Sequence, residues 1–233
     1  MRTALQRSPV RIFERATGGG LGRGRFGVVL GRPGSGKTAF LIGLALDALL
    51  HGRKVLHIST QESVERLSDF YAQIFSALCE HLGLEDRAEK LLEAERNRQI
   101  LVYNRKLFTL EKLEQSVAFL RQAVDFAPSF VILDGTPRFE TTERWEIDGI
   151  LRLAREWDAE VWTTTHTHRE GQVGDSRGVP LDVARYDDAL ALIVMLEARE
   201  DHMRVRVLKD HDRAEVPELR LELDPQALLL RWV

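Results

Sequence analysis

The stretch 27-GVVLGRPGSGKTAFL-41 contains the pattern G-x4-G-K-T between two apolar segments. The run 26-FGVVLG-31 is typical of a buried strand, and 37-KTAFLIGLALDALLHG-52 is typical of a helix that stops at a glycine. A strand, this loop and a helix, in that order, form the context in which the pattern binds nucleotide phosphates. The alternative interpretation is a glycine-rich turn that carries Lys and Thr without a ligand.

The residue types in the loop explain how it would hold a phosphate. Glycines let successive backbone N–H groups converge on an anion, and the following helix adds the partial positive charge of its first turn. We expect Lys37 to reach the β- and γ-phosphates of the nucleotide and the Thr38 hydroxyl to bind Mg²⁺. The predicted nucleotide-binding residues are Gly31, Arg32, Pro33, Gly34, Ser35, Gly36, Lys37, Thr38 and Ala39.

Strand and helix patterns alternate along most of the chain. After the strand 26–31 and the helix 37–52, the predicted strands are 54–60, 100–104, 129–135 and 160–166, and the predicted helices are 62–95, 110–127 and 143–158. The runs 189–198, 203–210 and 218–224 then predict antiparallel strands that close one edge of the sheet. We therefore predict an α/β fold, a three-layer α/β/α sandwich with a mostly parallel central sheet. Residues 1–233 form one domain, with residues 1–20 as an N-terminal extension.

Composition narrows the class of protein. The formal net charge is −3, so nothing in the overall balance attracts the chain to nucleic acid or to an anionic membrane. Cys79 is the only cysteine, which excludes an internal disulfide and fits a reducing compartment. The sequence has no apolar run that approaches the ~20 residues needed to span a bilayer and no signal-peptide pattern. We expect a cytoplasmic protein.

A second site residue follows from the run 130-FVILD-134, which places Asp134 at the end of a buried strand. A carboxylate there is expected to support Mg²⁺. The alternative is a strand-end aspartate that caps a turn. A complete strand with acidic residues, 54-KVLHISTQES-63, lies between Lys37 and Asp134, and an arginine-rich lid is missing. This arrangement disfavours a P-loop kinase for small substrates.

These segments together carry a resemblance that covers roughly residues 10 to 230. They are 18-GGGLGRGRFGVVLGRPGSGKT-38, 56-LHISTQES-63, 130-FVILD-134, 161-VWTTTHTHR-169 and 207-VLKDHDR-213. In this order the chain resembles the RecA-like P-loop ATPases, in particular the branch with KaiC, RadA and DnaB-type helicases. The resemblance implies a RecA-like fold, ATP and Mg²⁺ as ligands, a homo-oligomer, and an ATP/ADP cycle that serves as a switch or motor.

The residues that would act on water depart from the family pattern. In the family a glutamate after the second strand orients or deprotonates the attacking water, and Gln61 stands at that position here, followed by Glu62. Glutamine orients a water but is a poor general base. Either Glu62 takes over through a one-residue bulge, or hydrolysis is slow or lost, or Glu62 only begins the following helix. An ATPase and a nucleotide-binding regulatory module with little hydrolysis both remain open.

His166 falls where relatives carry a polar residue that senses the γ-phosphate. His166 and His168 are two residues apart, so on a strand they share a face. Three roles stay open for His166: a polar contact to the nucleotide, a structural histidine, or a metal ligand, for which no third ligand is evident.

In the family, a Lys and an Arg from one subunit reach the nucleotide of the next. Lys209 matches the Lys, His211 stands at the Arg position, and Arg213 lies two residues further on. If these residues form a finger in trans, the protein works as a ring or filament. The alternative is a set of ordinary exposed charges.

Nucleic-acid binding is an open alternative that the charge pattern does not favour. In DNA-binding relatives the loops after the fourth and fifth strands contact DNA, and these correspond to 135–144 and 167–185. Both segments mix acidic and basic residues, whereas phosphate neutralisation requires a surplus of positive charge. A recombination or helicase-associated ATPase is therefore ranked below a switch directed at a protein partner.

Overall fold

The computed structural model describes residues 8–167, 174–200 and 202–232. The helices are α2 (Pro9–Ala16), α3 (Lys37–Leu50), α4 (Val64–Leu82), α5 (Arg87–Arg96), α6 (Leu110–Ala123), α7 (Arg144–Trp157) and α8 (Leu181–Ala184). The strands are β1 (Arg25–Gly31), β2 (Val55–Ser59), β3 (Arg98–Val102), β4 (Phe130–Asp134), β5 (Glu160–His166), β6 (Leu190–Ala198), β7 (Met203–Asp210), β8 (Leu221–Leu223) and β9 (Leu230–Trp232). Short 3-10 turns lie at Arg105–Leu107 and Asp187–Ala189.

The strands of the described residues form one mixed sheet in the order β3-β2-β4-β5-β1-β6-β7-β8-β9. The pairs from β3 to β6 are parallel, and β7, β8 and β9 are joined by antiparallel pairs. The predicted α/β class with a mostly parallel sheet is confirmed. Because β1 lies between β5 and β6, the loop after it leaves the middle of the sheet.

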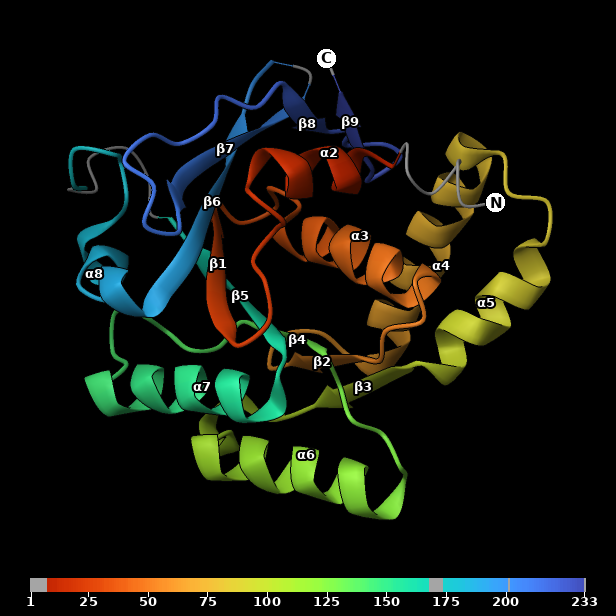
Figure 1. Cartoon of the computed structure of the whole chain (residues 1–233), viewed down its shortest axis with the longest axis horizontal. Coiled ribbons are helices and arrows are strands. Elements are labelled where there is room, and N and C mark those ends of the chain that lie inside the picture. Colours follow the sequence, from red (N-terminus) through yellow and green to blue (C-terminus); the bar gives the residue numbers. More distant parts are fainter. Residues whose placement is uncertain (1–7, 168–173, 201, 233) are drawn as a thin grey trace.

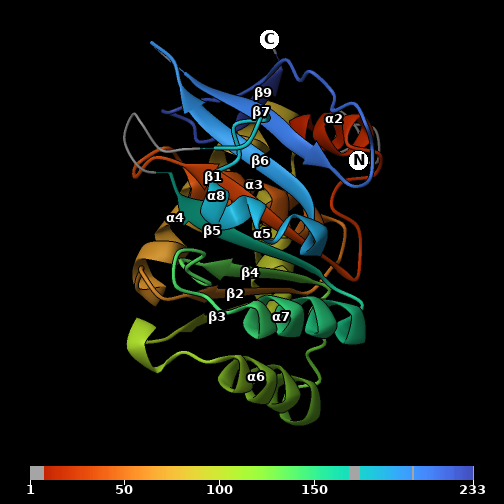
Figure 2. The same ribbon diagram turned by 90° about the vertical axis from the view of Figure 1, so that its left-hand side faces the viewer.

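Helices cover both faces of the parallel part (Figures 1 and 2). One hydrophobic core joins the sheet to α2, α3, α4 and α5, and the other joins it to α6, α7 and α8. Every residue of β2 and β4 is buried, as expected for strands covered on both sides. This explains why β4 is a continuous apolar run in the sequence up to Asp134.

One strand of the C-terminal group also has a parallel neighbour. The predicted antiparallel strands 189–198, 203–210 and 218–224 correspond to β6, β7 and β8, and the β6–β7 and β7–β8 pairs are antiparallel. On its other side β6 runs parallel to β1, with Phe26 opposite Leu190 and Gly31 opposite Leu196, a pairing that was not predicted. The chain that follows β5 passes through α8 and returns to the edge where β1 begins, so β6 starts beside the start of β1. A parallel pair requires such a crossover, and alternation within a strand does not reveal its direction.

The prediction of one helix over 62–95 is wrong, because the segment forms two helices, α4 and α5. Gly83, in the left-handed conformation with φ of 63°, closes α4. The amides of Gly83 and Leu84 then bond to the last turn of α4, through Glu80 O at 3.3 Å and Cys79 O at 3.0 Å. Glycine in this conformation ends helices, and the apolar periodicity continued past it.

Three elements were not predicted from the sequence, namely α2, the four-residue helix α8 and β9. The helix α2 lies inside the predicted N-terminal extension and begins with Ser8, whose hydroxyl accepts from the Val10 amide at 3.3 Å. Its Phe13 ring packs edge-on against Phe40 of α3, with ring centroids 5.7 Å apart. Residues 8–16 are therefore a built part of the α/β domain, packed on α3 and near β9 (Figure 1).

The described residues contain no helix with the length and apolar character needed to cross a membrane.

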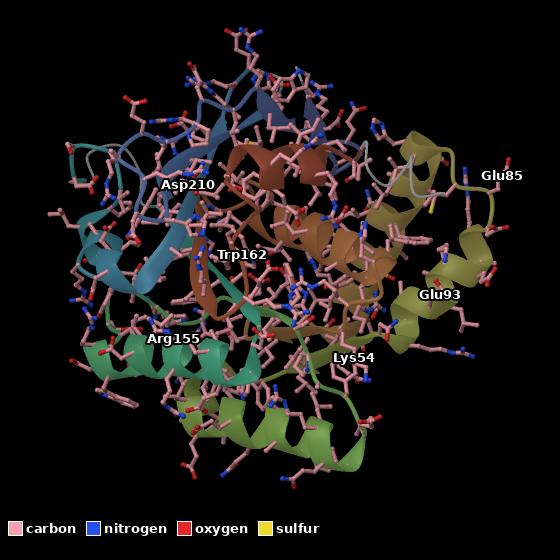
Figure 3. All side chains as sticks on the ribbon, in the orientation of Figure 1. Lys54, Glu85, Glu93, Arg155, Trp162 and Asp210 are labelled. Atoms are coloured by element: carbon pink, nitrogen blue, oxygen red, sulfur yellow. The ribbon has the colours of Figure 1, made fainter. Side chains whose placement is uncertain are left out.

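Trp162 of β5 provides a test of the packing around α3. Its side chain is 1% exposed, lies at the centre of the molecule (Figure 3), and packs against the backbone of Gly27. We expect Trp162→Ala to lower the free energy of unfolding by about 3–5 kcal/mol, because truncating a buried aromatic residue leaves a cavity. Urea unfolding measures this loss.

The matched control is Trp145→Ala on α7, where the indole is 63% exposed. Its effect is expected to stay within about 0.5 kcal/mol. Equal losses for the two variants would contradict the packing described here.

Candidate functional site

The loop between β1 and α3 is shaped by its glycines. Gly34 and Gly36 have φ values of 78° and 79°, in the left-handed region that glycine tolerates. A Cβ on Gly36 would lie 2.5 Å from a methyl carbon of Leu223 in β8, so a side chain has no room there. Among the described residues no side chain caps the start of α3. Its first N–H groups therefore keep their capacity to bind an anion.

Lys37 is buried in the first turn of α3. Its Nζ donates to the backbone oxygens of Gly31 at 2.9 Å and Arg32 at 2.8 Å, both neutral acceptors. Burial lowers the pKa of Lys37 from 10.5 to about 8, and the nearby Asp134 carboxylate offsets part of this effect. A buried ammonium with neutral partners favours the arrival of an anion.

Ser35 lies inside the same loop. Its Oγ is buried and, among the described residues, has no hydrogen-bond partner. A Cβ on Gly31 would be 2.4 Å from this oxygen, so the serine hydroxyl lies directly against the backbone of the loop. A buried hydroxyl without a partner calls for an explanation, and a ligand that enters the loop supplies one.

Asp134 joins the loop to the sheet through two hydroxyls. Thr38 Oγ1 donates to Asp134 Oδ2 at 3.0 Å, and Thr164 Oγ1 of β5 lies 2.6 Å from Asp134 Oδ1. The Asp134 side chain is buried on the face of the sheet that α3 covers, as alternation from Phe130 and Ile132 requires. The structure thus brings the predicted pair of Mg²⁺ residues, Thr38 and Asp134, together.

Thr164 was not predicted. The run of three threonines in β5 does not indicate which one contacts Asp134. Alternation places Thr164 on the same face of β5 as His166. The missing information was the neighbour of β5 in the sheet, which is β4 with Asp134 at its end.

Gln61 and Glu62 lie in a turn after β2. The Ser59 hydroxyl accepts from both of their amides, at 3.1 Å and 3.0 Å. The Gln61 side chain lies over Gly135, where an added Cβ would be 2.1 Å from its Nε2, so it is beside the Asp134 strand end. Glu62 pairs with Arg66 at 3.0 Å.

The helix after this turn begins at Val64, with Ser63 as its N-cap. Glu62 therefore precedes α4, and the interpretation of Glu62 as the first residue of that helix is wrong.

His166 ends β5 directly opposite Gly31 in the register of the parallel pair. The amide of Thr167 continues this pairing and donates to Gly31 O at 3.1 Å. Burial, followed by the charge of Lys37, lowers the pKa of His166. His166 is thus next to the start of the loop, and His168 lies outside the described residues.

The three residues of the predicted finger lie far from the loop 31–38, at the end of the sheet where β1 begins. β7 runs antiparallel to β6, so its last residues are level with the start of β1. Lys209 Nζ bonds to Asp187 Oδ2 at 3.0 Å. His211 Nε2 contacts Leu21 O at 3.0 Å.

Asp210, labelled in Figure 3, holds the rest of this segment. Its carboxylate is buried and contacts His211 Nδ1 at 2.6 Å and Arg213 Nη1 at 2.8 Å. Lys209, His211 and Arg213 are therefore all engaged with groups of their own chain, and the structure does not bring them to the loop 31–38.

The residues at the loop fit Mg²⁺ bound together with phosphates. Mg²⁺ usually binds through one or two carboxylates, waters and substrate phosphate oxygens, and Thr38 and Asp134 provide a hydroxyl and a carboxylate oxygen in contact. Within the described ranges, groups of three or more His, Cys, Asp and Glu that would hold a metal without such a ligand do not occur.

No protein-family model matches the chain, and a search of curated proteins gives no match. The assignment of function therefore depends on the residues and their geometry.

The pKa of Lys37 predicts how stability changes with pH. The folded-state value of about 8 is below the ordinary 10.5, so between these values the unfolded chain binds more protons than the folded protein. The free energy of unfolding therefore rises with pH across this window. We expect wild type to gain on the order of 2 kcal/mol relative to Lys37→Met, which has no ammonium.

Urea unfolding of both proteins at a series of pH values measures this difference. If the difference in free energy of unfolding between wild type and Lys37→Met stays constant from about pH 7 to pH 10.5, folding does not lower the pKa of Lys37.

Proposed function

We propose that this protein binds ATP with Mg²⁺ in the loop 31–38 and is a RecA-like ATPase. The observation that carries the proposal is the buried Lys37 ammonium, which has neutral partners, inside a glycine-shaped loop at an uncapped helix start. Burial of the ammonium is a cost in the free protein, and a bound phosphate would offset it and would accept from the N–H groups at the start of α3.

The roles of the residues follow from their positions. Lys37 would contact the β- and γ-phosphates, while the loop amides and Ser35 would surround them. Thr38 and Asp134 would hold Mg²⁺, which on binding neutralises phosphate charge. His166, which ends β5 level with Gly31 of β1, would make a polar contact to the nucleotide.

The sheet order supports the RecA-like type. β5, which ends in His166, lies between β4 and β1, so a polar strand end stands between Asp134 and the loop. β2 with Gln61 and Glu62 lies on the other side of β4. The turn that would act on water is thus adjacent to the Mg²⁺ residues, as the resemblance to RecA-like ATPases implies.

Removing the Lys37 charge tests nucleotide binding. We expect Lys37→Ala to weaken Mg-ATP binding about 10- to 100-fold, the effect of losing a charge-assisted hydrogen bond worth about 1.5–3 kcal/mol. Isothermal titration calorimetry measures the affinity. Lys112→Ala, on α6 at the face of the sheet away from α3, is the control and should bind as wild type does. Equal affinity for wild type and Lys37→Ala would overturn the proposal.

A regulatory module with little hydrolysis is the second candidate, and the turn after β2 favours it. Gln61, a poor base, is the residue beside Asp134, and Glu62 is paired with Arg66. That ion pair is solvent-exposed and worth less than about 1 kcal/mol, so it does not keep Glu62 from the nucleotide. An ATPase with Glu62 as base therefore remains the first candidate.

Turnover of the Gln61 and Glu62 variants separates the two candidates. If Glu62 is the base, Glu62→Ala should reduce the rate of Mg-ATP hydrolysis by about 10²–10⁴-fold, the range of general-base catalysis. Gln61→Ala should cost less, because glutamine only orients water. Equal turnover in wild type and Glu62→Ala, with ATP binding intact, would remove Glu62 from the mechanism and leave the regulatory module.

Assembly is part of the proposal. In a homo-oligomer, Lys209, His211 or Arg213 of one copy would face the nucleotide of the next. A protein partner would bind the ATP and ADP states with different affinity. Light scattering with and without Mg-ATP tests whether the nucleotide promotes assembly.

A further inference from the structure

We infer that Thr164 is a positioning residue that fixes the orientation of the Asp134 carboxylate for Mg²⁺. This inference rests on the proposed function, because it concerns the metal that would accompany ATP. It adds a residue from β5 to a site otherwise built from the loop 31–38 and β4.

The direction of the hydrogen bond is determined by its surroundings. A threonine hydroxyl has one proton to donate. The Gly135 amide donates to Thr164 Oγ1 at 3.1 Å, so that oxygen already acts as an acceptor. The hydroxyl proton is therefore left for Asp134 Oδ1, 2.6 Å away. A hydrogen bond to an ionised carboxylate is among the stronger kinds.

The two oxygens of Asp134 have separate tasks. Oδ1 accepts from Thr164, and Oδ2 accepts from Thr38 Oγ1 at 3.0 Å. Among the described residues these are the hydrogen-bond donors to the side chain of Asp134, which is 3% exposed. Holding Oδ1 against β5 therefore leaves Oδ2 turned toward Thr38 and the place of the metal.

The backbone of Asp134 is fixed independently, so Thr164 controls the side chain in particular. The Thr60 amide donates to Asp134 O at 3.1 Å, which ties the end of β4 to β2. The remaining freedom of Asp134 is rotation of its carboxylate. Thr164 limits that rotation, and its own χ1 is restricted because it is β-branched and lies within a strand. Groups behind a metal ligand usually act in this way.

Thr163, the preceding residue, offers a matched control. Its hydroxyl is also buried and has two backbone oxygens within hydrogen-bond distance of its one proton, Thr136 O at 2.6 Å and Leu133 O at 3.0 Å. It points to the opposite face of β5 and has no part in the bonding of Asp134. Thr163→Val and Thr164→Val thus each remove one buried hydroxyl from the same strand, and only the second removes a donor to Asp134.

The experiment measures Mg²⁺ affinity apart from activity. A fluorescent ATP analogue is bound to each variant, and Mg²⁺ is titrated. For Thr164→Val we expect Mg²⁺ affinity to fall about 10- to 100-fold, the usual cost of losing a group behind a metal ligand. Binding of the analogue without Mg²⁺ should stay within about twofold of wild type, because Thr164 does not touch the loop. Thr164→Ser keeps the hydroxyl and should restore Mg²⁺ affinity.

Thr163→Val should bind Mg²⁺ as wild type does, and urea unfolding of all variants confirms that each is folded. If Thr164→Val does not fold, Thr164→Ala supplies the same comparison. Mg²⁺ affinity of a folded variant without the hydroxyl within twofold of Thr163→Val would overturn the inference alone. Wild type that binds neither the analogue nor Mg-ATP would instead overturn the proposed function and, with it, the inference.

Discussion

The buried Lys37 ammonium is the constraint around which the loop is organised. Its hydrogen-bond acceptors, Gly31 O and Arg32 O, are neutral, and burial lowers its pKa to about 8. The free protein gains little from this arrangement, because a charge held away from water is costly and the nearby Asp134 carboxylate offsets only part of that cost. The cost becomes useful only if an anion arrives. An anion would also bind the N–H groups at the uncapped start of α3.

The parallel sheet brings distant residues to this ammonium. Parallel strands end at one edge, and β1, β2, β4 and β5 are neighbours in the order β2-β4-β5-β1. Ser59 is therefore level with Asp134, and Gly31 with His166, although each pair is far apart in the sequence. Hydroxyls at these strand ends then fix the loop after β2 and the carboxylate of Asp134. The geometry of the site follows from strand direction before any side chain is considered.

Much of this could be predicted from the sequence, and the failures have physical reasons. The strand–loop–helix pattern and the buried run before Asp134 are local, so they predicted the positions of the loop and of Asp134. The parallel pairing of β6 with β1 depends on a crossover and not on local alternation, so it was not predicted. Gly83 breaks the helix 62–95 by its backbone conformation, which apolar spacing does not record. Thr164 was missed because its partner is decided by sheet order.

The position of β7 limits what the segment 209–213 can do. Since β7 runs antiparallel to β6, this segment lies at the edge where β1 begins, while the loop 31–38 lies where β1 ends. Within one chain the two regions are separated by the length of the strand. Any contact between Arg213 and a nucleotide must therefore come from another copy, and it requires Arg213 to leave the buried Asp210 carboxylate. Because Asp210 would keep His211 as a partner, that exchange does not leave a buried charge alone.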